Sequence, residues 1–203
     1  MTDVAELRAL FEREAERDRP ESDRPDVGII MGSDSDLDTM AGASEVLEEL
    51  GFTELTDYDD PPASQYTYES WVVSAHRTPD LMYAYGETAA ARGLDVILAG
   101  AGGKSADLPN MTASIAYPVP VVGIPVQEKS VDSVIGMPSG APITAVDAGK
   151  SGNAALSAVQ ILARSDETLR DRLVERHETQ AADVANVSEK LHSQGTSAFR
   201  ESR

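Results

Sequence analysis

The sequence predicts an α/β fold in which helices cover both faces of a central parallel sheet, with one further helix at the C-terminus. Short apolar runs typical of buried strands alternate with amphipathic stretches of helical length. Several of these runs pass directly into a helix start, which is the connection that parallel strands require. With 203 residues, the chain has the size of one domain with a sizeable core.

Residues 1–25 form a charged extension ahead of this core. Apolar residues at helical spacing give the extension a thin apolar stripe, which predicts a short helix. The residues of this stripe are Val4, Leu7, Leu10 and Phe11. We therefore expect three parts in the chain: the extension, an α/β domain at 26–165, and a C-terminal helix with a tail at 166–203.

The elements of the α/β domain follow one another in alternation. Strands are predicted at 26–31, 71–74, 94–99, 120–124 and 142–147, and helices at 35–50, 78–92, 107–116, 151–164 and 166–190. A loop with a short helix is expected at 125–142. Residues 52–70 are acidic and rich in turn residues, which predicts a surface insertion, and 191–203 are expected to form a loose tail.

Composition excludes several classes of protein. The chain has no cysteine, so it forms no disulfide and offers no thiolate for catalysis or zinc binding. No apolar run approaches about 18 residues and the N-terminus lacks the pattern of a secretory signal, so we expect a cytoplasmic protein with no membrane partner. The formal net charge of −18 argues against nucleic acid as a partner.

The same charge predicts adaptation to a high-salt, halophilic cytoplasm. In dilute salt, 35 acidic side chains against 17 basic ones repel one another, and halophiles use this property. The alternative is an ordinary acidic protein of a mesophilic organism. In either case an anionic substrate needs a locally positive pocket.

The most informative segment follows the second predicted strand, where Ser74, His76 and Arg77 come just before a helix start. Thr78 suits the N-cap and Pro79 the first helical position. Ligands bind at the carboxyl ends of parallel strands, and a helix N-terminus favours an anion such as phosphate. Arg77 adds a forked cation, and His76 can gain or lose a proton near neutral pH. The alternative is a surface histidine and arginine beside an ordinary helix cap.

Two other strand ends offer polar or flexible residues. After the first strand, the Ser33 hydroxyl can bind phosphate and the Asp36 carboxylate can accept hydrogen bonds from ribose hydroxyls. The alternative is that these residues merely cap the helix that follows. After the third strand, Gly102 and Gly103 belong to a loop whose glycines let the backbone approach a ligand. This loop matches neither the dinucleotide fingerprint nor a P-loop.

Together, these segments resemble class I 5-(carboxyamino)imidazole ribonucleotide mutases of purine biosynthesis. The resemblance covers roughly residues 26–164, and its most specific part is Ser-Ala-His-Arg-Thr-Pro-Asp at 74–80. The other matching segments, in the order of the family, are Met-Gly-Ser-Asp-Ser-Asp at 31–36, Ala-Gly-Ala-Gly-Gly at 99–103, Leu-Pro at 108–109, Val-Gly-Ile-Pro-Val-Gln at 122–127, Val-Asp-Ser at 131–133, Met-Pro at 137–138 and Asn-Ala-Ala-Leu at 153–156.

This resemblance implies a flavodoxin-like three-layer αβα sandwich and a specific reaction. The substrate is a small-molecule ribonucleotide whose carboxylate moves from the exocyclic nitrogen to ring carbon 4, with no metal, nucleotide cofactor or ATP. The site residues that it implies are His76 as the proton carrier, Ser33, Asp36 and Arg77 for substrate binding, Ser74 at the phosphate, and Gly102 and Gly103 in the pocket wall. It also implies a homo-octamer.

Two departures from the family leave alternatives open. Where relatives commonly have a histidine before Leu-Pro, this chain has Asp107, and its segment 127–137 is shorter than in bacterial relatives. Asp107 either caps the following helix or pairs with Lys104, which would supply a cation to the migrating carboxylate. The alternative enzyme is a carboxylase that adds free carbon dioxide to aminoimidazole ribonucleotide. The alternative of another class is a non-catalytic nucleotide- or flavin-binding module.

Overall fold

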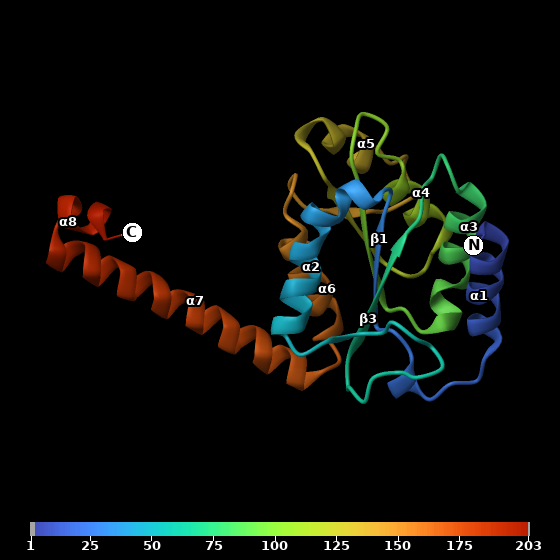
Figure 1. Cartoon of the computed structure of the whole chain (residues 1–203), viewed down its shortest axis with the longest axis horizontal. Helices are drawn as coiled ribbons and strands as arrows, with labels where there is room; N and C mark the ends of the chain where they lie inside the picture. The colour runs from blue at the N-terminus through green and yellow to red at the C-terminus, as the bar shows by residue number, and fades with distance from the viewer. Residues whose placement is uncertain (1–2, 203) are drawn as a thin grey trace. The chain divides into compact units, whose positions relative to one another are not determined.

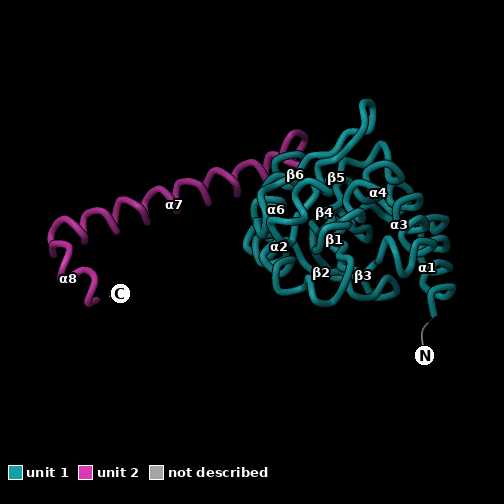
Figure 2. The backbone as a smooth tube through the Cα atoms, turned by 90° about the horizontal axis from the view of Figure 1, so that it is seen from above, with its two compact units in different colours: residues 1–161 teal, residues 162–203 magenta. Residues whose placement is uncertain are grey.

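The computed structural model describes residues 3–202 and forms two compact units, with the boundary between residues 161 and 162 (Figure 2). The first unit contains one six-stranded sheet in which all neighbouring strands are parallel. The strands are β1 (Val27–Met31), β2 (Thr53–Glu54), β3 (Thr67–Val72), β4 (Val96–Ala101), β5 (Val121–Pro125) and β6 (Thr144–Ala145).

The strand order is β2-β3-β1-β4-β5-β6. With the short edge strand β2 set aside, this is the order of a flavodoxin-like sheet, so the predicted fold is confirmed. Met31 at the end of β1 pairs with Val72 of β3 on one side and with Gly100 of β4 on the other. The strand order reverses between β1 and β4, and ligands bind at the carboxyl ends of the strands at such a point.

Helices cover both faces of the sheet, as Figure 1 shows. On one face lie α2 (Leu37–Glu49) and α6 (Ser151–Leu162), and on the other lie α3 (Pro79–Arg92) and α4 (Leu108–Ile115). The short α5 (Val131–Ile135) lies near the carboxyl ends of the strands, and α1 (Val4–Glu16) lies against α3. Three short 3-10 turns occur at Glu21–Asp23, Asp34–Asp36 and Glu128–Ser130.

The segment predicted as a surface insertion at 52–70 is partly a piece of the core, so that prediction is wrong. It contains β2 and the first residues of β3, which begins at Thr67 rather than at the predicted residue 71. Its buried apolar side chains are Phe52, Leu55, Tyr58, Tyr66 and Tyr68. Polar residues within β3 interrupt the apolar run, which is why the pattern indicated a shorter strand.

The second unit consists of α7 (Glu167–Gln194) and α8 (Thr196–Glu201). The tail predicted to be loose at 191–203 is therefore helical up to Glu201, with a break at Gly195, whose φ of 78° suits glycine. The described residues do not include residue 203 of that predicted tail or residues 1–2 of the predicted extension. No helix within residues 3–202 combines the length and the apolar character needed to cross a membrane.

A buried ion pair lies between the sheet and α3. Arg92 Nη1 lies 2.6 Å from Glu69 Oε1, and each side chain is 1 % exposed. The Tyr58 hydroxyl donates to the other Glu69 oxygen and accepts from Arg92 Nη1 at 3.0 Å. Burial alone would lower the pKa of Arg92, but Glu69 and the neighbouring phenols outweigh it and raise the pKa, so the guanidinium is charged.

The expected N-terminal helix is present as α1, and Phe11 anchors it. This residue is fully buried, and its ring meets those of Trp71 and Tyr85 edge-on at centroid distances of 5.0 and 5.3 Å. The Arg92 guanidinium carbon lies 4.8 Å from the centre of the Phe11 ring. The extension is thus tied to the same buried charge pair that joins β3 to α3.

Replacing Phe11 with leucine is expected to lower the free energy of unfolding by about 2 kcal/mol. Leucine keeps an apolar side chain there, but both edge-on ring contacts and the cation–π contact are lost. Urea unfolding at fixed salt measures the change. Val4→Ala, at the exposed N-terminal end of the same helix, is the control and should have little effect. A Phe11→Leu variant as stable as the wild type would show that these ring contacts do not hold the extension.

Candidate active site

A cavity of about 440 Å³ opens at the carboxyl ends of β1, β3 and β4. This is the position expected from the strand order. The residues that the family resemblance implies for the site all line it: Ser33, Asp36, Ser74, His76, Arg77, Gly102 and Gly103. Lys104, the alternative cation, does not. The structure thus brings together three strand ends that lie far apart in the sequence.

The loop from β3 to α3 is a compact turn closed by its own side chains. The backbone N–H of Ser74 donates to the Thr78 hydroxyl at 2.9 Å, and the N–H of Thr78 donates to the Ser74 carbonyl at 3.0 Å. Thr78 does occupy the N-cap of α3, with Pro79 after it, but its hydroxyl binds back to Ser74 instead of capping the helix. The turn fixes the path of the backbone at His76 and Arg77.

Arg77 joins two of the strand ends. Its Nη2 donates to the Gly32 carbonyl after β1 at 2.7 Å, and its Nε donates to the Ser74 hydroxyl at 3.4 Å. Within residues 3–202, Nη1 of Arg77 has no hydrogen-bond partner. The guanidinium is therefore held in place with donors still available to a phosphate or carboxylate.

Asp36 lies 7 % exposed at the inner side of the cavity. Burial raises the pKa of this carboxyl, against a backbone hydrogen bond from Ser33 and the charge of Arg77, which both lower it. The Ser33 hydroxyl donates to Asp34 at 3.0 Å and begins the turn before α2. Such an aspartate, with a serine beside it, is suited to bind the hydroxyl groups of a ligand.

The glycine loop after β4 passes close to Asp36. A Cβ atom on Gly102 would lie 3.1 Å from Asp36 Oδ1, so a larger residue would displace the carboxylate. Gly103 has a φ of 86°, which side-chain-bearing residues rarely adopt. The Ser130 hydroxyl donates to the Gly103 carbonyl at 2.8 Å and ties this loop to the segment after β5.

His76 has a partner that the sequence did not predict. Its Nε2 lies 3.0 Å from Asp107 Oδ2, with 61 % of the histidine side chain and 37 % of the aspartate side chain exposed. Asp107 makes no side-chain capping bond to α4, and no ion pair joins it to Lys104, although both residues belong to the described part of the chain. Asp107 does occupy the N-cap position of α4, as one interpretation from the sequence expected, but its side chain points to His76 instead of capping the helix, and the expected pair with Lys104 is not formed.

Other lining residues were not predicted one by one. Besides Asp107, the cavity is lined by Ser35, Ser105, Gln127 and Lys129, among others. Gln127 and Lys129 follow the carboxyl end of β5, so the strand-end argument used for the other loops could have found them. Lys129 brings a second cation to the cavity.

The arrangement suits proton transfer on a small anionic substrate. The cavity offers one imidazole, a forked cation, a buried carboxylate and a glycine-rich wall. Among residues 3–202, no group of three or more histidine, cysteine, aspartate or glutamate side chains is placed to hold a metal ion. The imidazole and the cations that line the cavity can supply acid–base catalysis beside an anion-binding pocket.

Comparison with known proteins agrees with this description. The family model for AIR carboxylase matches residues 26–183. An N5-carboxyaminoimidazole ribonucleotide mutase of Bacillus subtilis is 45% identical over 176 residues, which cover 83% of this chain and 99% of that protein. A protein of the same name from Mycobacterium tuberculosis is 46% identical over 161 residues, covering 76% of this chain and 83% of its own. The crystal structure of Treponema denticola PurE is similar in fold, with a TM-score of 0.67 and 23% identity over 83% of this chain and 99% of that one.

Proposed function

The chain belongs to the AIR carboxylase family, and we propose that it is an N5-carboxyaminoimidazole ribonucleotide mutase of purine (IMP) biosynthesis. The Bacillus subtilis and Mycobacterium tuberculosis relatives bear this name, which favours a mutase over a carboxylase that uses free carbon dioxide. The observation on which the proposal rests is the placing of His76 beside Arg77 in a cavity at the strand ends. A module that only binds a nucleotide would need the cation but not the imidazole.

The reaction needs one proton given and one removed. As the N–C bond of the carbamate breaks, carbon dioxide leaves, and the exocyclic nitrogen takes a proton from the His76 imidazolium. Ring carbon 4 then bonds to the carbon of carbon dioxide, and the neutral imidazole removes the proton from ring carbon 4. The imidazole ends in the protonation state in which it began. General acid–base catalysis of this kind typically raises the rate by about 10²–10⁴-fold.

The other residues of the cavity bind and orient the substrate. Arg77 and Ser74 hold the phosphate at the N-terminal end of α3, where backbone N–H groups also favour an anion. Ser33 and Asp36 bind the ribose side of the substrate through their oxygens. Gly102 and Gly103 form a wall that lets the backbone approach the ring. No residue in this proposal requires a metal, a nucleotide cofactor or ATP.

Turnover with defined substrates tests the proposal. A mutase converts N5-carboxyaminoimidazole ribonucleotide to the carbon-4 carboxylate in bicarbonate-free buffer, and also runs the reverse conversion from that product. A carboxylase forms product from aminoimidazole ribonucleotide only when bicarbonate is added, and 13C-bicarbonate then enters the product in full. A chain that binds these ribonucleotides and converts none of them would contradict the enzyme assignment.

The site favours assembly into the homo-octamer that the sequence resemblance implies. Carbon dioxide must be kept from escaping, so catalysis needs a closed cavity. In one subunit, however, the His76 side chain is 61 % exposed. α7 also presents exposed apolar side chains that can pack against other subunits: Val174, Val184, Val187 and Leu191. The subunits of the octamer would then close the cavities.

Light scattering at high salt is expected to give eight times the 21.6 kDa mass of one chain. Val184→Asp should lower that mass, because it places a charge on the apolar side of α7. Asn186→Asp, on the opposite side of the same helix and already polar, is the matched control and should leave the mass unchanged. A wild-type protein that scatters as a monomer would contradict the octamer.

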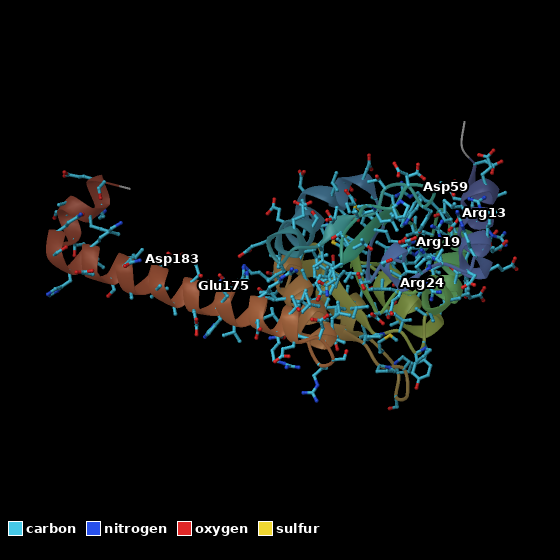
Figure 3. The ribbon with its side chains drawn as sticks, turned by 90° about the horizontal axis from the view of Figure 1, so that it is seen from below. Arg13, Arg19, Arg24, Asp59, Glu175 and Asp183 are labelled. Carbon is cyan, nitrogen blue, oxygen red and sulfur yellow. The ribbon has the colours of Figure 1, made fainter. Side chains whose placement is uncertain are left out.

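We also propose that the enzyme works in the cytoplasm, since a phosphorylated substrate does not cross membranes unaided. The net charge of −18 supports the further proposal that this cytoplasm is rich in salt. The Tm is expected to rise by about 10 °C between about 0.1 M and about 2 M potassium chloride, because salt screens the repulsion of a net charge of −18. The variant Glu175→Gln/Glu178→Gln/Asp183→Asn removes three charges of α7, two of them labelled in Figure 3, and should show a smaller rise. A Tm that is flat with salt would indicate an ordinary acidic protein.

A further inference from the structure

The Asp107 carboxylate is held from one side and faces His76 on the other. Its Oδ1 accepts a hydrogen bond from the Ser133 hydroxyl at 3.1 Å, while its Oδ2 lies 3.0 Å from His76 Nε2. Ser133 is fixed in turn, because Asn110 Nδ2 donates to its carbonyl oxygen at 2.8 Å. Contacts from α4 and α5 therefore set the position of a carboxylate that is partly open to solvent.

This contact determines which ring nitrogen of His76 carries no proton when the imidazole is neutral. If Nε2 carried no proton, its lone pair would lie 3.0 Å from an oxygen of an ionised carboxylate and the two would repel, so this contact favours a proton on Nε2. In the neutral imidazole, the other nitrogen, Nδ1, is then the one without a proton. Nδ1 is consequently the atom that can take a proton from ring carbon 4 and, once protonated, give one to the exocyclic nitrogen.

We propose that Asp107 is the positioning residue of the proton carrier, selecting the tautomer of His76 with its proton on Nε2 and fixing the orientation of the ring. Asp107 keeps its contact with the protonated Nε2 throughout the reaction and takes no proton itself. The role parallels that of the aspartate that orients a catalytic histidine in hydrolytic triads. The inference rests on the proposed function only for the step in which Nδ1 exchanges protons with substrate.

Nitrogen-15 NMR of the imidazole groups tests the tautomer without any turnover. In its neutral form, His76 is expected to show one tautomer, with the proton on Nε2. The exposed His177 and His192 of α7 are internal controls and should show the mixture of an imidazole in water. Asp107→Ala should return His76 to that mixture. A wild-type His76 that shows the mixture, or that bears its proton on Nδ1, would overturn the proposal.

Kinetics test whether Asp107 acts through His76. Asp107→Asn is expected to lower kcat by about 10–10²-fold with little change in KM, because the ring loses its fixed tautomer. In a His76→Asn background the same change should alter kcat by less than about twofold, since nothing remains to be positioned. Asp132→Asn is the matched control and should leave kcat unchanged. It removes the same charge from an exposed position of α5, next to Ser133, the residue that holds Asp107.

If Asp107→Asn lowered kcat by the same factor in the His76→Asn background as in the wild type, the positioning role would be contradicted, because Asp107 would then act by another route. A fall in kcat for Asp132→Asn as large as that for Asp107→Asn would indicate that only the local charge matters. Failure of the proposed function would look different. In that case the wild type would not convert the ribonucleotides, while the tautomer of His76 could still be read from the NMR spectrum.

Discussion

Replacing His76 with asparagine is expected to lower kcat by about 10²–10⁴-fold while KM stays within about threefold of the wild type. Asparagine has a similar reach and can still contact Asp107, but it cannot exchange a proton. Among residues 3–202, His76 is the one histidine that lines the cavity. Substrate binding should persist, because Arg77, Ser74 and Asp36 are unchanged.

The control for this variant is His177→Asn, an identical change at an exposed position of α7. It should leave both kcat and KM as in the wild type. Binding of the substrate to His76→Asn, measured by calorimetry, separates loss of chemistry from loss of the site. Near-normal turnover by His76→Asn would remove this residue from the mechanism.

The location of the site could be predicted from the sequence, because the carboxyl ends of parallel strands meet at one edge of a sheet. Ser33 and Asp36 follow β1, His76 and Arg77 follow β3, and the glycine loop follows β4. Each strand end alone was compatible with simple helix capping. Their convergence on one cavity was expected because the alternating pattern required a parallel sheet.

The partner of His76 could not be predicted in the same way. Asp107 stands directly before α4, where a short acidic residue is a normal N-cap, and the sequence offered Lys104 as the nearer opposite charge. The direction of its side chain depends on Ser133 of α5, 26 residues further along the chain. Contacts of this kind depend on tertiary packing, and no local pattern encodes them.

The buried charge pair was missed for a related reason. Glu69 lies in a stretch whose charges and turn residues predicted a surface insertion, and Arg92 ends a helix where a basic residue normally faces solvent. Only the packing of β3 against α3 brings the two together. A buried charge is stable when it is paired, and the sequence alone does not show the pairing.

Arg92→Met is expected to lower the free energy of unfolding by about 3–5 kcal/mol, because it leaves the Glu69 carboxylate buried without its cation. Methionine keeps much of the volume of the arginine stem, so the loss measures the charge more than a cavity. The variant also removes the cation–π contacts to Phe11 and Tyr85, whose ring centres lie 4.8 and 4.6 Å from the guanidinium carbon. Urea unfolding at constant salt measures the loss.

The double variant Arg92→Met/Glu69→Leu distinguishes an unpaired charge from poor packing. If the buried carboxylate causes the loss, removing it should restore most of the stability, since apolar residues often replace a buried ion pair at little cost. Asp59→Asn is the surface control. It breaks the exposed pair of Asp59 with Arg17 at 2.6 Å, and solvent makes such a pair far weaker, so its effect should be small. A double variant less stable than Arg92→Met alone would mean that the Glu69 carboxylate stabilises the fold through Tyr58 even without its arginine.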